Sequence, residues 1–147
     1  MSDSQFPVIR QTVIDTPDPR GLGDFYRQLL GLQWSPGDEP GGATDLSALE
    51  AGEPIDWTGL DDASGRRILA FQRVQGLPRP VWPDGNPPQM MHLDLAVPDA
   101  AVLEHQRARA EQLGATMIRD ESADPDEALY VFTDPSGHPF CIFVAAA

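Results

Sequence analysis

Apolar and polar positions in the first half of the chain alternate in a pattern that predicts a strand followed by a helix. Residues 8–16 are rich in β-branched side chains and stop at Pro17, which predicts a strand. The next segment predicts an amphipathic helix that begins after Asp18, an N-cap residue, and ends at Gly31. Its apolar residues recur at helical spacing: Leu22, Phe25, Tyr26, Leu29 and Leu30.

After this helix the hydrophobic period shortens. Residues 32–35, 57–60 and 66–74 predict strands, the last two joined by a turn at residues 62–65. Residues 36–43 predict a loop, and the stretch from there to Asp56 is ambiguous. The first half is therefore expected to form a β-α-β-β-β module over residues 7–74.

The second half repeats this plan. It predicts a strand at 90–97, a helix from its cap Asp99 to Leu113 that Gly114 ends, and three strands at 116–121, 128–134 and 139–145. The lettering repeats as well: QTVIDTPDP resembles HLDLAVPDA, and DASG before one strand resembles DPSG before another. Residues 75–89, which carry five prolines and two glycines, predict a semi-extended connector between the modules.

Composition narrows the class of protein. A length of 147 residues with 41% hydrophobic content suits one domain, residues 1–147, with modules at 7–74 and 90–147. The net charge of −13 argues against nucleic acid and membrane surfaces as partners, and paired arginines such as Arg66 and Arg67 are expected on solvated surfaces. Cys141 is the single cysteine, and no segment has the pattern of a signal peptide or a membrane span, so we expect a cytoplasmic protein.

The segments VIDTPDPRGLGDFYRQLLGLQW, RRILAFQRV, MMHLDLAVPD, LGAT and DPSGHPFCI resemble, in this order, the glyoxalase/bleomycin-resistance/extradiol-dioxygenase (vicinal oxygen chelate) superfamily, and most closely its glyoxalase-like domain group. The resemblance implies an α+β fold of two βαβββ modules, whose curled mixed sheets surround a shared cavity with the helices outside. In metal-using relatives, His or Glu residues from the first and last strand of each module bind one divalent ion. Other relatives have no metal and sequester a drug or metabolite.

Superposition of the modules on this resemblance places Gln11 where His92 stands. Cys141 occupies a position where the metal-binding Glu often lies, and its first-module counterpart is Ala70 or Gln72. If a metal is present, His92 and Cys141 are the expected ligands. Asp94 lies roughly 6.5 to 7 Å from His92 along a regular strand, which is awkward for sharing one ion. We therefore expect the usual metal site to be largely missing and no cofactor to be required, although a divalent metal remains an alternative.

Each candidate residue has two interpretations. His92 is either an interior histidine hydrogen-bonded to Asp94 or a backbone carbonyl, or a ligand donor and general base, and it is the catalytic candidate. Cys141 is expected to be an inert buried thiol rather than a nucleophile. Trp57 either walls a cleft or packs in a core. The expected ligand-binding set comprises Gln11, Trp57, Gln72, His92, Asp94 and Cys141.

The favoured function is a homodimeric protein that binds a small metabolite or drug, to sequester or to transform it. Whether it is an enzyme stays open at this stage. A divalent-metal-dependent lyase, isomerase or dioxygenase is the first alternative, with ligands such as Glu50, Glu53 or Asp56 from an uncertain third strand. A non-catalytic interaction module is the second, because this scaffold hosts many chemistries and also proteins with none.

Overall fold

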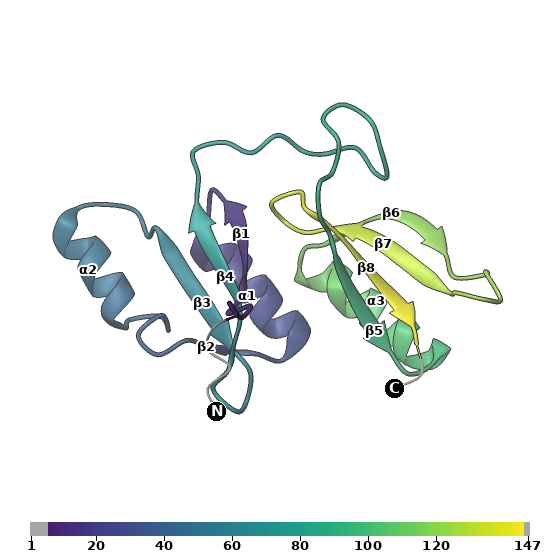
Figure 1. Ribbon diagram of the computed structural model, residues 1–147, viewed down its shortest axis with the longest axis horizontal. Helices are drawn as coiled ribbons and strands as arrows, with labels where there is room; N and C mark the ends of the chain where they lie inside the picture. Colours follow the sequence, from purple (N-terminus) through teal and green to yellow (C-terminus); the bar gives the residue numbers. More distant parts are fainter. Residues whose placement is uncertain (1–5, 146–147) are drawn as a thin grey trace. The chain divides into compact units, whose positions relative to one another are not determined.

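The computed structural model describes residues 6–145 and divides the chain into two compact units, Met1–Gln75 and Gly76–Ala147 (Figure 1). Each unit contains one four-stranded mixed sheet. The elements of the first unit are β1 (Thr12–Thr16), α1 (Pro19–Leu30), β2 (Gln33–Trp34), α2 (Ala43–Ala51), β3 (Trp57–Asp61) and β4 (Arg67–Arg73). Those of the second are β5 (Leu93–Val97), α3 (Ala100–Leu113), β6 (Thr116–Glu121), β7 (Leu129–Thr133) and β8 (Pro139–Val144).

Helix α1 has the boundaries that the sequence predicts. The side chain of Asp18 accepts a hydrogen bond from the Gly21 amide at 2.9 Å, and Gly31 ends the helix with a φ of 66°, a left-handed conformation that favours glycine. The apolar side of α1 packs on a sheet with the strand order β1-β4-β3-β2. Tyr26 of this helix stacks on Phe71 of β4, with ring centroids 5.9 Å apart.

The second unit repeats the arrangement with the order β5-β8-β7-β6. In both sheets the first strand pairs in parallel with the last, and the other pairs are antiparallel. Asp99 caps α3 by accepting a hydrogen bond from the Val102 amide at 2.9 Å, and Phe132 and Phe140 stack in the core with centroids 5.2 Å apart. The predicted α+β fold of two βαβββ modules is confirmed.

Each sheet has one face covered by its own helix and an opposite face, which we call the helix-free face. In the first unit Ile14 and Thr16 are buried toward α1, whereas Val13 and Asp15 alternate with them and are exposed. In the second unit Val97 is buried toward α3, whereas Asp94 and Ala96 are exposed on the helix-free face. The strands thus present two rows of side chains, one toward the helix and one on the helix-free face.

Two strands begin later than the sequence predicts. β1 begins at Thr12 rather than at residue 8, and β5 begins at Leu93 rather than at residue 90. Val8 and Met91, which the sequence assigns to these strands, are 86% and 76% exposed. The β5 ladder starts where its neighbour β8 starts, since Leu93 pairs with Phe140, one residue after Pro139. The residues before His92 extend past the first residue of β8, so they have no neighbouring strand with which to form backbone hydrogen bonds.

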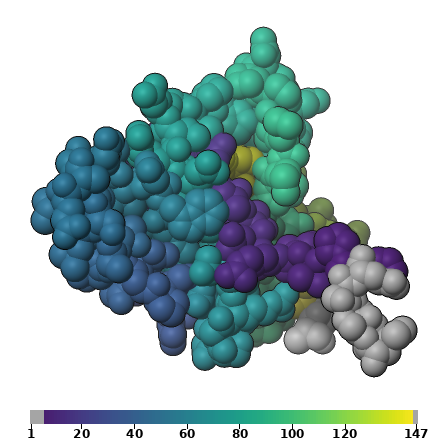
Figure 2. All heavy atoms as spheres, turned by 60° about the vertical axis from the view of Figure 1, so that its left-hand side comes forward, coloured from purple at the N-terminus to yellow at the C-terminus, as the bar shows by residue number. Residues whose placement is uncertain are grey.

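The ambiguous stretch before Asp56 forms the helix α2, which the sequence does not predict. The expectation that Glu50, Glu53 and Asp56 lie on a strand is wrong, because Glu50 lies in the last turn of α2 and the other two precede β3. None of the residues of α2 is buried, and in Figure 2 its blue atoms form an outer surface of the first unit.

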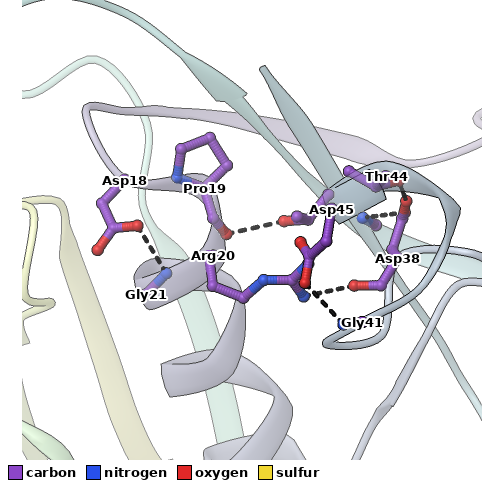
Figure 3. Close-up of polar contacts among 10 residues, drawn as sticks. Asp18, Pro19, Arg20, Gly21, Asp38, Gly41, Thr44 and Asp45 are labelled. Atoms are coloured by element: carbon purple, nitrogen blue, oxygen red, sulfur yellow. Dashed lines mark hydrogen bonds and ion pairs between the residues drawn. The ribbon is translucent and has the colours of Figure 1, made fainter. Parts of the chain in front are cut away.

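Polar contacts hold α2 to α1 in place of a buried apolar face (Figure 3). The guanidinium of Arg20 donates to the backbone oxygen of Asp38 and to the carboxylate of Asp45. Asp38 in turn accepts hydrogen bonds from Thr44 Oγ1 and from the Gly59 amide of β3. These contacts form a latch between the loop before α2, α2 itself and the first turn of α1.

The boundary between the units falls at the start of the proline-rich segment. This segment is less extended than expected, because residues 81–88 fold back on themselves. The Val81 amide donates to the carbonyl oxygen of Pro87 at 2.9 Å, and Val81 forms an isolated bridge with Pro88. Over residues 6–145, the chain contains no helix with the length and apolarity that crossing a bilayer requires.

Candidate functional site

The second unit brings His92, Asp94 and Cys141 together on its helix-free face. Asp94 of β5 pairs with Cys141 of β8, and aligned residues on parallel neighbours project to the same face of a sheet. His92 directly precedes β5. The candidate ligand atoms of the three side chains all lie within 4.8 Å of one another.

His92 is held by three neighbours from its own unit. Its Nε2 lies 3.2 Å from Oδ1 of Asp94, and its Nδ1 lies 3.4 Å from Oε1 of Gln89. The edge of its ring meets the Trp82 ring, with centroids 4.9 Å apart. The expected partner Asp94 is therefore correct. The imidazole is not interior, however, because 31% of the side chain is exposed, which leaves it accessible to a ligand.

The strand-spacing argument that separated His92 from Asp94 is wrong. It assumes that both residues belong to one regular strand, but β5 begins only at Leu93. His92 lies in the preceding segment, where Gln89 and Trp82 contact the imidazole while its Nε2 reaches the Asp94 carboxylate. The reason given for excluding Asp94 as a third metal ligand therefore does not hold.

Cys141 has the environment of a protonated thiol. The pKa of its thiol is raised to about 11, chiefly by burial and then by the neighbouring Asp94 carboxylate, which accepts a hydrogen bond from the thiol. Glu127 and Glu121 contribute in the same direction. The expectation of a buried cysteine is confirmed, and with this pKa the thiol is a poor nucleophile near neutral pH.

The first unit carries different chemistry at the matching positions. Val13 pairs with Ala70 as Asp94 pairs with Cys141, so Gln11, two residues before Val13, occupies the place of His92. Oε1 of Gln11 accepts a hydrogen bond from Nη1 of Arg67 at 3.0 Å. Ala70 is fully buried and its side chain offers no donor atom. These positions do not fit a divalent cation, because a guanidinium already binds the one available oxygen.

Arg67 belongs to a polar network that the sequence interpretation missed. Its Nε lies 3.1 Å from Oδ1 of Asp61, which also accepts a hydrogen bond from Ser35 Oγ at 2.6 Å. A Cβ on Gly59 would lie only 3.2 Å from Nη1 of Arg67, so the guanidinium lies over this glycine on the helix-free face. The expected solvated surface is wrong for Arg67, whose side chain is 23% exposed. The available signal was a glycine inside a strand, which often marks a close approach.

The remaining candidates lie in the first unit. Trp57 of β3 pairs with Gln72 of β4, so both project to the helix-free face, with Gln72 exposed and Trp57 half-buried. The structure therefore places Gln11, Trp57 and Gln72 on one face of the first unit, and His92, Asp94 and Cys141 on one face of the second. The cavity expected between the modules stays a prediction.

The donor set in the second unit fits a transition metal. Imidazole nitrogen, carboxylate oxygen and thiolate sulfur are the ligands that zinc uses, and sites with three protein ligands keep a position for water or substrate. The chain therefore contains a group of residues able to ligate a divalent metal.

The duplicated unit, with the first strand parallel to the last and a helix on one face, is the architecture of the vicinal oxygen chelate superfamily. Within it, the chain belongs to the glyoxalase-like domain family, whose model matches residues 11–143. The match spans both units and includes all six candidate ligand-binding residues. No curated protein matches the sequence of the chain.

Solved structures share the fold at low sequence identity. A glyoxalase/bleomycin resistance protein/dioxygenase family enzyme from Burkholderia phytofirmans is 18% identical with a TM-score of 0.61, covering 92% of this chain and 96% of its own. A fosfomycin resistance protein from Mesorhizobium loti is 11% identical with a TM-score of 0.61, covering 99% and 95%. A lactoylglutathione lyase from Agrobacterium tumefaciens is 15% identical with a TM-score of 0.57, covering 94% and 93%. At these identities the likeness concerns the fold.

Proposed function

We propose that this protein binds a small metabolite or drug at its helix-free sheet faces, either to sequester it or to transform it. The observation that carries the proposal is the group on the helix-free face of the second sheet in which the exposed His92 and Asp94 lie beside the buried Cys141. Gln11, Trp57 and Gln72 on the first sheet complete the proposed ligand-binding set. A few convergent polar groups beside aromatic side chains are typical of small-molecule sites.

The geometry gives each polar group a role toward a ligand. The Asp94 carboxylate and the Gln89 amide orient the imidazole of His92, and this partly exposed ring can hydrogen-bond a ligand that displaces Gln89. In the first unit, Arg67 lies beside Gln11 and supplies positive charge in a protein of net charge −13. The first face suits a ligand with an anionic or carbonyl oxygen for Arg67, and the second suits a ligand with a polar group for His92.

A binding screen tests this proposal. Suitable probes are fosfomycin, bleomycin and S-lactoylglutathione, which represent the ligands named for structural relatives. We expect calorimetry to show binding of at least one probe, either in buffer with chelator or in buffer with zinc. His92→Ala should weaken the affinity for that probe at least about 10-fold. The matched control is His105→Ala, which removes an exposed histidine on α3. Equal weakening by both variants, or binding unchanged in His92→Ala, would contradict the proposal.

The metal-ligating group favours a second candidate function, a divalent-metal-dependent lyase, isomerase or dioxygenase. His92, Asp94 and Cys141 would hold the ion, which would supply Lewis acidity to a substrate oxygen. Metal analysis of protein purified without chelator tests this candidate. About one equivalent of a transition metal supports it, and less than a tenth of an equivalent, unchanged after zinc is added and excess removed, contradicts it.

We also propose a homodimer, since superfamily relatives place ligands between modules or between subunits. Leu46 and Leu49 of α2, which are 55% and 79% exposed, supply apolar surface for such an association. Light scattering after size exclusion should give twice the chain mass of 16.0 kDa. A single-chain mass across micromolar concentrations would contradict the dimer.

A further inference from the structure

The three metal-ligating side chains all belong to the second unit. His92 directly precedes β5, Asp94 lies in β5 and Cys141 lies in β8, all within Gly76–Ala147. In the metal-using relatives that the sequence resembles, both modules supply ligands. Here the matching positions of the first unit hold Gln11, bound to Arg67, and Ala70. A cation at this protein would therefore draw its ligands from one unit.

The donor types select the kind of metal. A thiolate favours zinc-type ions over magnesium or calcium, which prefer oxygen ligands only. In a tetrahedral zinc site with ordinary bond lengths, donor atoms lie about 3.3 to 3.6 Å apart. The present atoms lie within 4.8 Å of one another, so side-chain shifts of about 1 Å bring them into range. Asp94, whose side chain is 58% exposed, and His92 have the freedom to make these shifts.

Three surrounding features suit a bound cation. Gln89 Oε1 lies 3.4 Å from Nδ1 of His92, so it can accept that N–H when Nε2 binds the metal, as acceptors behind metal-bound histidines do. Glu121 and Glu127 lie close enough to Cys141 to raise the pKa of its thiol, so the site lies in a region of negative potential. The exposure of His92 and Asp94 leaves room for a fourth ligand from solvent or substrate.

We propose that the second unit alone holds one zinc-type ion through His92, Asp94 and Cys141, with Gln89 orienting the imidazole and no ligand from the first unit. On binding, the Cys141 thiol releases its proton to solvent and the sulfur ligates as a thiolate. This inference rests on the proposed placement of the functional site at His92, and it adds the class of metal and the source of its ligands.

Cobalt and zinc titrations of the full chain test the site directly. After chelator treatment and its removal, Co²⁺ should bind with a stoichiometry of one and give visible bands of tetrahedral cobalt together with a near-ultraviolet thiolate-to-cobalt band. Zn²⁺ should abolish these bands and bind more tightly by calorimetry. Cys141→Ala should lose the near-ultraviolet band. Asp94→Asn changes an exposed side chain, so the circular dichroism spectrum should stay unchanged. The affinity for zinc should fall at least about 10-fold.

Gln11→Ala distinguishes a one-unit site from the usual two-unit site, because Gln11 occupies the position equivalent to His92. Its zinc affinity should match that of the unaltered chain, as should that of His105→Ala, the control for adventitious surface imidazole. Cobalt binding well below one equivalent, or a Cys141→Ala spectrum identical to that of the parent, overturns the inference. So does an unchanged zinc affinity in Asp94→Asn, or a loss of zinc affinity in Gln11→Ala equal to that in Asp94→Asn.

The titrations contain no small molecule, so their outcome is independent of the ligand screen. Failure of metal binding with retained, His92-dependent ligand binding would remove this inference and leave the proposed function. If one equivalent of cobalt binds but no small molecule does, the proposed ligand-binding function is removed and this inference stands.

Discussion

Gly59 lies where the backbone of β3 passes beneath two polar side chains. A Cβ there would come within 2.7 Å of Ser35 Oγ and 3.2 Å of Arg67 Nη1, both members of the network around Asp61. We expect Gly59→Ala to displace this network and to lower the free energy of unfolding by about 1 to 3 kcal/mol, as over-packing of a well-packed site does. Urea denaturation measures the change.

Gly76→Ala is the matched control for this prediction. A Cβ at Gly76 meets no atom within 4 Å. The free energy of unfolding of this variant should therefore lie within about 0.5 kcal/mol of that of the parent. Equal stability of the two variants would show that Ser35 and Arg67 make room for the methyl group without cost.

Cys141 gives a prediction about pH. Its thiol has a pKa of about 11 in the folded chain, against an ordinary value of 9.0, so at pH 8 the folded protein holds about 100-fold less thiolate than the unfolded chain. Iodoacetamide, with chelator present, should therefore alkylate folded protein at least about 100-fold more slowly than protein in urea. Asp94→Asn should accelerate the folded reaction only partly, because burial is the larger cause of the shift. Equal rates in folded parent and unfolded chain would contradict the assigned environment.

The sign of the same shift fixes a dependence of stability on pH. The folded state binds the thiol proton more tightly than the unfolded state, so the contribution of Cys141 is fully present below pH 9 and is lost as pH rises toward about 11. The urea midpoint of the parent should fall more steeply between pH 8.5 and 10.5 than that of Cys141→Ala, in the presence of chelator. Parallel profiles would show that the thiol does not titrate with folding.

The candidate residues show how far alternation along a strand predicts a site. The period of two places Asp94 on the same face as Cys141 once the strands are aligned, and it places Gln72 beside Trp57. It fails for His92, since the contact with Asp94 depends on where β5 begins. It also fails for Arg67, because only the close approach to Gly59 brings the guanidinium over the sheet.

Among the elements, α1 and α3 are predictable because caps at both ends agree with the positions of their apolar residues. Helix α2 is not, because its nine residues bury no side chain and Gly42 makes no side-chain cap. Such a short helix is marginal by itself. Its stability depends on contacts distant in sequence, and those are invisible to a local pattern.

Arg20 should therefore control the order of α2. Arg20→Ala removes the contacts with the Asp38 carbonyl and the Asp45 carboxylate, and also the cation–π contact with Trp34 at 4.8 Å. We expect amide hydrogen exchange in residues 43–51 to become several-fold faster while the global urea midpoint changes little, since α2 buries no core residue.

Arg27→Ala is the control for the latch. Arg27 also lies over Trp34, at 5.9 Å, but its ion pair is with Asp24 of its own helix, at 2.7 Å. This variant should leave exchange in α2 unchanged. If both variants accelerate exchange equally, the tryptophan stacking rather than the ion pair with Asp45 holds α2.

At the scale of the whole molecule, the duplication makes the site interpretable. In both sheets the first strand lies beside the last and is parallel to it. Equivalent positions in the two units can therefore be compared directly within this one chain. That comparison shows a division of chemistry. The second unit carries an imidazole, a carboxylate and a thiol, whereas the first carries an amide bound to a guanidinium. The two units therefore share a scaffold and differ in the chemistry of their helix-free faces.

The charge balance of the whole chain predicts a response to salt. There are 23 acidic and 10 basic residues, so negative charges outnumber positive ones by 13, and compaction brings like charges together. Salt screens attraction and repulsion alike, but the repulsive pairs outnumber the attractive ones. The Debye length falls from about 30 Å at 0.01 M to about 8 Å at 0.15 M ionic strength, so we expect sodium chloride to raise Tm over this range by about 2 to 4 °C. Potassium and choline chloride should act equally if screening is the cause. A larger rise with sodium alone would indicate a specific cation site, and a fall in Tm would show that the ion pairs outweigh the general repulsion.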